Sequence, residues 1–155
     1  MACIAFSRTF KNNREGYSDN KQVKIAFHSN QLGRRGTEVS LFDYAYFNEK
    51  LLNNKSIIIS DKNGNNDDEV IKKFKKHFPV YLYNDFKEVD KILKKENCDI
   101  FYIIKSGGND GKISKVCKTV AHCVYGCHDP HGDVYSSISP WISGNGGKYP
   151  VVPHM

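Results

Sequence analysis

The sequence predicts an α/β fold, and two features of its apolar pattern support this prediction. Short segments rich in Ile, Val, Tyr and Phe alternate along the chain with longer segments whose apolar residues recur at helical spacing. The short segments are apolar almost throughout, as in strands that a parallel sheet buries on both faces. Because parallel strands are joined by right-handed crossovers, the alternation predicts a Rossmann-like parallel sheet with helices on both faces.

Size and composition place the chain among single soluble domains. It has 155 residues, of which 39% are hydrophobic and 26% charged, and a chain of this size can bury one core. No segment approaches the roughly 18 apolar residues that a transmembrane helix needs, and charges interrupt the first residues where a secretory signal would be apolar. Five cysteines, an odd number, favour reduced thiols over a disulfide framework. We therefore expect a cytoplasmic protein.

The chain divides into a short extension and one domain. Residues 1–21 are polar and rich in Asn, Arg, Ser and Gly, which predicts a loosely ordered N-terminal extension. The Rossmann-like domain is expected over residues 22–155. Its first strand is predicted at residues 23–28, and the glycines within residues 30–36 predict a loop after it.

A helix is predicted over residues 37–52, where apolar residues recur at helical spacing. We expect Val39, Phe42 and Ala45 to face the core of the domain. The charged side chain of Glu38 is expected to face outward.

The remaining elements follow the same alternation. Further strands are predicted at residues 56–60, 80–83, 99–104 and 118–124, and further helices begin at residue 67 or 68 and at residue 85. A last short strand is predicted at residues 149–155. Residues 134–143, which lie between two glycine-rich segments, carry no predicted element.

The formal net charge is +6, and much of it belongs to two predicted helices. The lysines concerned are Lys72, Lys73, Lys75 and Lys76 in one helix and Lys87, Lys91, Lys94 and Lys95 in the next. Because they lie opposite the apolar stripes, solvated helix faces are favoured over a dedicated binding patch, and no nucleic-acid partner is expected. A weak attraction of these lysines to an anionic membrane surface stays open as an alternative.

The loop after the first strand is the first candidate site, since ligands of open α/β sheets bind at the carboxyl ends of the strands. Gly33 and Gly36 would let the backbone approach a ligand, and Arg34 and Arg35 offer forked donors to phosphate or carboxylate. An ordinary turn with solvated arginines fits the same residues equally well. The segment has neither the dinucleotide-binding fingerprint nor a P-loop.

His122 is the second candidate, because it falls at the carboxyl end of a predicted strand, at the same edge as that loop. A histidine there can orient a sugar hydroxyl, relay a proton or stabilise developing charge. One alternative is a core histidine bonded to the backbone. A structural zinc site with Cys117, Cys123, Cys127 and His128 is another, although the spacings match the usual patterns poorly.

Taken in order, several motifs resemble a known family. They are KIAFHS at residues 24–29, GRRGTE at 33–38, His122 at the end of a strand, YSSISPWI at 135–142 and VVPH at 151–154. Together they look like the amino-terminal half of a GT-B glycosyltransferase of the GT4-like kind (glycosyl transferases group 1). The resemblance covers nearly all of the chain from residue 23.

This resemblance implies one half of a GT-B fold, within an enzyme that transfers a sugar from a nucleotide-diphosphate sugar to the hydroxyl of a sugar or glycan acceptor. It implies retention of configuration, with no metal and no other cofactor. The residues that would meet the donor are Gly33, Arg34, Arg35, Gly36 and Thr37. His122 would lie beside the reacting sugar carbon as the catalytic residue, and Ser139 would lie toward the acceptor.

The family's carboxyl-terminal domain, which binds most of the donor, is absent from this chain. The resemblance therefore implies a second domain in cis or in trans, and little or no turnover by this chain alone. In the family the first loop carries paired glycines, which two arginines separate here. The alternative function is a non-catalytic Rossmann-like module that holds an anionic ligand or partner through Arg34 and Arg35.

Overall fold

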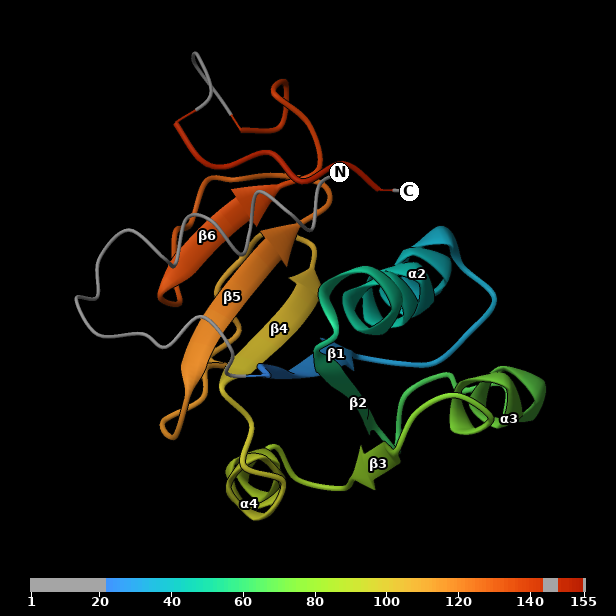
Figure 1. Ribbon diagram of the computed structural model, residues 1–155. Helices are drawn as coiled ribbons and strands as arrows, with labels where there is room; N and C mark the ends of the chain where they lie inside the picture. Colours follow the sequence, from blue (N-terminus) through green and yellow to red (C-terminus); the bar gives the residue numbers. More distant parts are fainter. Residues whose placement is uncertain (1–21, 144–147, 155) are drawn as a thin grey trace.

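The structure is a computed structural model that describes residues 22–143 and 148–154 (Figure 1). The extension expected over residues 1–21 lies outside the described residues. The strands are β1 (Lys24–Ser29), β2 (Lys55–Asp61), β3 (Val80–Tyr83), β4 (Ile100–Lys105), β5 (Lys118–Cys123) and β6 (Val134–Ser137). The helices are α2 (Gly36–Leu52), α3 (Asp68–Lys75) and α4 (Lys87–Lys95).

All strands are parallel and form one sheet with the order β3-β2-β1-β4-β5-β6. From β1 the chain moves outward to β3 and then returns to β4 on the other side of β1, so the strand order reverses between β1 and β4. All carboxyl ends lie at one edge of the sheet. In open α/β sheets, the carboxyl edge at such a reversal is where ligands bind.

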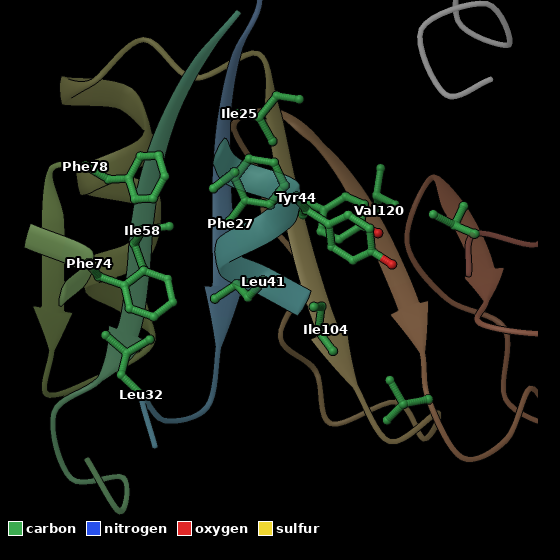
Figure 2. Close-up of a cluster of buried hydrophobic side chains, with 14 residues drawn as sticks. Ile25, Phe27, Leu32, Leu41, Tyr44, Ile58, Phe74, Phe78, Ile104 and Val120 are labelled. Atoms are coloured by element: carbon green, nitrogen blue, oxygen red, sulfur yellow. The ribbon is translucent and has the colours of Figure 1, made fainter. Parts of the chain in front are cut away.

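The sheet separates two hydrophobic clusters, because side chains alternate between its two faces. On one face, Phe27 and Ile58 pack with residues of α2 and α3, and Figure 2 shows Phe74 and Phe78 beside Ile58. On the other face, Ile57 packs with Val89 and Leu93 of α4 and with other residues. Helices α2 and α3 therefore cover one face and α4 covers the other (Figure 1). The predicted parallel sheet with helices on both faces is confirmed.

Helix α2 buries Ala45 and packs Phe42 against the core as predicted, but its first turn differs from the prediction. Leu41, Tyr44 and Ala45 are buried, whereas Val39 is 52% exposed. Glu38, which was expected to face outward, is only 3% exposed. The prediction was wrong because it treated a charged side chain as solvent-facing, whereas hydrogen bonds inside the domain hold this one.

The carboxyl-terminal part also differs from the prediction. Residues 134–137, which carried no predicted element, form β6 beside β5. The strand expected at residues 149–155 is reduced to an isolated bridge between Ser137 and Val151. β6 ends on two serines whose hydroxyls bond to backbone carbonyls, so its polar composition concealed a buried strand. No helix in the described part of the chain is long and apolar enough to cross a membrane.

Candidate functional site

Polar side chains are buried at the carboxyl ends of most strands. These residues are His28 and Ser29 on β1, Ser60 on β2, Lys105 on β4, His122 on β5, and Ser136 and Ser137 on β6. A buried polar atom without a hydrogen bond costs about 1–3 kcal/mol, yet Nδ1 of His28, Oγ of Ser60 and Nε2 of His122 have no hydrogen-bond partner among the described residues. Such atoms often mark a place where a ligand or water belongs. The carboxyl edge is therefore the candidate functional site.

His122 lies at this edge on the face of the sheet that α2 covers. Its side chain is fully buried, and its Nδ1 is 2.6 Å from the hydroxyl of Tyr102. The rings of Tyr44 and His154 flank it, with centroids 5.8 Å and 5.5 Å away. A histidine in such an aromatic surrounding has little water to stabilise its charged form.

Burial lowers the pKa of His122 to about 4, and the neighbouring His154 lowers it further, while the Val152 carbonyl partly opposes the shift. The imidazole is therefore neutral near pH 7. A neutral ring has one N–H, and the Tyr102 hydroxyl occupies Nδ1. The Tyr102 hydroxyl then donates to Nδ1, which leaves His122 as a neutral donor through Nε2.

The segment 150–154 covers this histidine. Val152 donates its backbone N–H to the Ser137 carbonyl at 2.7 Å, and the Tyr44 hydroxyl donates to the Pro153 carbonyl at 2.7 Å. Burial lowers the pKa of His154 as well, and its Nε2 has no partner in the described part of the chain. Two neutral imidazoles thus lie next to each other, and the Nε2 atom of each forms no hydrogen bond with a described residue.

The turn between β1 and α2 carries the first predicted site, and both of its arginines have local partners. Arg34 donates through Nε to the carboxylate of Asp67 at 2.7 Å, and Arg35 donates to the side-chain oxygen of Gln31. The Arg34 pair holds the pKa of Asp67 below its usual value. Asp67 also caps α3 by accepting backbone N–H groups, so the turn is tied to the start of α3.

Neither glycine of this turn has a left-handed conformation. A Cβ added at Gly36 would meet no atom within 4 Å, and one added at Gly33 would press mainly on the flexible end of Gln31. The turn therefore does not require glycine at these two positions for its own geometry. Close approach of a ligand to the backbone remains the predicted reason for them.

Glu38, in the first turn of α2, is the polar residue of this region that the sequence analysis missed. Its Oε1 accepts hydrogen bonds from the hydroxyls of Ser29 at 3.1 Å and Thr37 at 3.0 Å. Its Oε2 is buried and has no partner among the described residues. The available signal was position, because a carboxylate in the first turn is stabilised by the helix dipole.

Ser139 has a role in local structure. Its Oγ accepts the backbone N–H of Ile142 at 3.3 Å, and its carbonyl accepts bonds from Ser137 and Ser143. These contacts form a turn directly after β6. The acceptor-side role implied for Ser139 stays a prediction.

The structure brings the predicted residues to one edge but not into one cluster. The turn at residues 33–36 contacts Gln31 and the start of α3, whereas His122 contacts Tyr102 of β4 and the middle of α2. Strand β4 lies between β1 and β5. A ligand that met both would have to extend along the carboxyl edge over β4.

In the described part of the chain, no group of three or more His, Cys, Asp and Glu side chains could hold a metal ion. The alternative of a structural zinc site therefore has no ligand set among these residues. Burial raises the pKa of Cys123 to about 11 and also raises the pKa of Cys127. Both groups are therefore thiols near pH 7.

The arrangement supplies hydrogen-bond donors and acceptors without charge on the imidazoles. Nε2 of His122 can donate, and Oε2 of Glu38 can accept, which suits a ligand whose groups do both, such as a hydroxyl. Comparison of the chain with protein-family models, with curated proteins and with solved structures finds no match.

Proposed function

We propose that this chain is the acceptor-side half of a GT-B glycosyltransferase, within an enzyme that moves a sugar from a nucleotide-diphosphate sugar to a hydroxyl. The observation that carries the proposal is His122, a neutral and fully buried imidazole at the carboxyl end of β5. Its Nε2 forms no hydrogen bond with the described residues. The order of motifs that resembles the GT4-like family adds independent support.

In the proposed reaction His122 binds the sugar next to the bond that changes. A neutral Nε2–H can donate to a sugar hydroxyl without placing a positive charge beside an oxocarbenium-like transition state. Tyr102 holds the ring through its bond to Nδ1. The Nε2–H group of His122 is therefore oriented before the sugar binds. Such preorganisation of binding groups contributes a large part of the rate enhancement of many enzymes.

Glu38 and Thr37 extend the proposed site along the edge toward β1. Oε1 of Glu38 holds the Ser29 and Thr37 hydroxyls, and its Oε2 is the acceptor that a sugar hydroxyl would meet. The start of α2 would also offer backbone N–H groups to the donor's phosphates. The rest of the donor would bind to a second domain, supplied in cis or in trans.

The test is a titration of the chain with a panel of nucleotide sugars and free sugars, followed by amide chemical shifts. We expect shift changes at Thr37, Glu38 and His122, with weaker binding than in the presence of the proposed second domain. His122→Asn should abolish the changes around β5. His128→Ala, which alters an exposed histidine, is the matched control and should leave them intact.

Two outcomes would contradict the proposal. The first is the absence of any response at Thr37, Glu38 and His122 across the panel. The second is a response centred on Arg34 and Arg35 that simple anions reproduce equally well. That result would favour the non-catalytic module that holds an anionic ligand.

A further inference from the structure

A second polar cluster lies between β1 and β4, on the face of the sheet that α4 covers. His28 and Lys105 belong to it, and both are buried. The Lys105 side chain is only 2% exposed, and its ammonium forms an ion pair with Asp110 from the loop that follows β4. A buried ammonium costs several kcal/mol unless it is fully compensated. The position of Lys105, at the reversal of strand order, therefore needs an explanation.

The charged groups that act on His28 are the ammonium groups of Lys112 and Lys105 and the carboxylate of Asp110. The carboxylate of Asp61 acts on the neighbouring Tyr83. Asp110 is the partner of Lys105 and also accepts the backbone N–H of Lys112. The ammonium of Lys112 donates to the neutral side chain of Asn30 at 2.6 Å. The Lys105 ammonium is thus the one paired with the carboxylate, whereas a neutral amide holds the Lys112 ammonium. His28 contributes no charge, because burial, followed by the influence of Lys112, lowers its pKa to about 3 although Asp110 opposes the shift.

His28 adds a polar atom that has no partner. Its Nε2 is 3.0 Å from the Tyr83 hydroxyl, and burial raises the pKa of Tyr83 so that this hydroxyl stays protonated. With the Tyr83 hydroxyl donating to Nε2, the imidazole hydrogen resides on Nδ1. Nδ1 has no hydrogen-bond partner among the described residues. It is a buried donor that no described acceptor satisfies.

The loop that carries Asp110 is packed at Gly107, and its second half is held by hydrogen bonds within the loop and to Asn30. The Gly107 carbonyl accepts the Tyr135 hydroxyl at 2.6 Å, and a Cβ at Gly107 would collide with the backbone of Gly126. Gly111 has φ of 74° and no atom within 4 Å of an added Cβ. Asp110 itself is 39% exposed. Asp110 is therefore the solvent-accessible member of the ion pair, and Lys105 is the buried one.

We propose that Lys105, Lys112 and His28 form a binding site for a phosphate group of a small molecule, and that Asp110 acts as the counter-ion that this phosphate replaces. An incoming phosphate would meet both ammonium groups and the unpartnered imidazole hydrogen. Charge-assisted hydrogen bonds to phosphate are among the strongest that side chains form. The site is on the opposite face of the sheet from His122 and does not depend on the proposed glycosyltransferase function.

The experiment is an amide-shift titration of the chain with inorganic phosphate, a hexose phosphate and a nucleoside diphosphate. We expect saturable changes at Lys105, at His28 and in the loop around Asp110. Tighter binding of the hexose phosphate than of inorganic phosphate would indicate a sugar phosphate as the ligand. Tighter binding of the nucleoside diphosphate would indicate a nucleotide.

Three variants sharpen this test. Lys105→Met should weaken phosphate binding about tenfold or more, because a charge-assisted hydrogen bond is lost. Lys72→Met, on the exposed face of α3, is the matched control and should change the affinity less than about twofold. Asp110→Asn removes the competing carboxylate and should tighten binding roughly fivefold.

Equal losses in Lys105→Met and Lys72→Met would overturn the proposal, because they would indicate general attraction of anions. Loss of binding in Asp110→Asn would also overturn it, since the carboxylate would then be part of the recognition. If Lys105→Met does not fold, Lys112→Met replaces it, with an expected loss of about threefold. An unchanged affinity in a folded Lys112→Met would likewise contradict the proposal.

Discussion

His28 and His122 are buried histidines near the carboxyl ends of two strands, and each is bonded to a tyrosine, yet their surroundings differ. His122 faces α2 and lies among the rings of Tyr44, Tyr102 and His154. His28 faces α4 and lies near the charges of Lys105, Asp110 and Lys112. One face of the sheet therefore presents a neutral hydrogen-bonding site and the other a charged one.

This difference follows from the alternation of side chains along each strand. His28 is in register with Ile103 of β4, and Ile103 is in register with Ala121 of β5. His122 is one residue further along β5, so its side chain points to the opposite face. Each histidine then meets the helices and loops of its own face. Two sites with different chemistry can thus share one sheet edge without sharing a contact.

The largest expected effect is on stability at low pH, where both histidines act in the same direction. Their pKa values are lowered from 6.5 to about 3 for His28 and about 4 for His122, so below pH 6.5 the unfolded chain binds protons that the folded chain does not. Stability is then lost as pH falls. Between pH 7 and 4.5 the free energy of unfolding should drop by about 5 kcal/mol.

Urea denaturation at a series of pH values measures this loss. His28→Gln and His122→Asn should each remove about half of it, and His154, whose pKa burial also lowers, adds a smaller part. An unchanged pH dependence in the double variant would show that neither histidine is buried in its neutral form. Carboxylates whose pKa values are lowered in the folded state change the free energy of unfolding mainly below pH 4. They therefore contribute little to the change between pH 7 and 4.5.

The second-largest expected effect comes from removing a buried aromatic side chain from one face of the sheet only. Phe101 is fully buried on the α4 face, with its ring centroid 5.4 Å from that of His28. Phe101→Ala should lower the free energy of unfolding by about 3–5 kcal/mol and raise the pKa of His28 by admitting water. The pKa of His122, on the other face, should not change.

Thermal or urea denaturation and histidine ring NMR provide both measurements. Val116→Ala, at a side chain that is largely exposed, serves as the control and should cost less than about 0.5 kcal/mol. Equal pKa changes at both histidines would mean that the two faces are coupled through the sheet.

The hydrogen bonds of Tyr83 to His28 and of Tyr102 to His122 provide a test with a smaller expected effect, one on each face of the sheet. Tyr83→Phe and Tyr102→Phe each leave a histidine nitrogen without its partner, which should cost about 1–3 kcal/mol. Because the pairs lie on opposite faces, the costs should add in the double variant. A coupling energy above about 0.5 kcal/mol, from urea denaturation of the four proteins, would show that the two histidine sites are not independent.

The smallest effect compares a serine that has a hydrogen-bond partner with one that has none. Ser29 donates to Glu38, whereas Oγ of Ser60 is buried without a partner among the described residues. Ser29→Ala should cost about 1 kcal/mol, and Ser60→Ala should be neutral or slightly stabilising. A clear loss of stability in Ser60→Ala would indicate that an ordered water or a ligand group normally satisfies this hydroxyl.

The elements that the sequence predicted correctly are those with strong local patterns. Strands β1 to β5 lie within one or two residues of their predicted positions, because their segments are apolar almost throughout and end at clear turn residues. Strand β6 was missed, since two of its residues are serines whose burial depends on bonds to neighbouring backbone. The local sequence of β6 does not indicate which backbone carbonyls lie beside its serines in the fold.

The candidate site was predictable only in part. The position of His122 at the carboxyl end of a strand follows from the alternation of elements, and its catalytic role stays a prediction. The burial of Glu38 and the ion pair of Lys105 were not predicted. Both need partners from other segments, namely Ser29 for the glutamate and Asp110 for the lysine.

By itself, the sequence determined the fold class, the order of strands and helices, and the edge of the sheet where polar residues end the strands, because these depend on periodicity and on the handedness of crossovers. The tertiary structure alone decided that Glu38 rather than Val39 is buried in the first turn of α2, and which histidine lies among aromatic rings. It also decided which of the two lies among charges. These depend on contacts between residues far apart in the chain, where burial and a specific partner together set the state of each polar group.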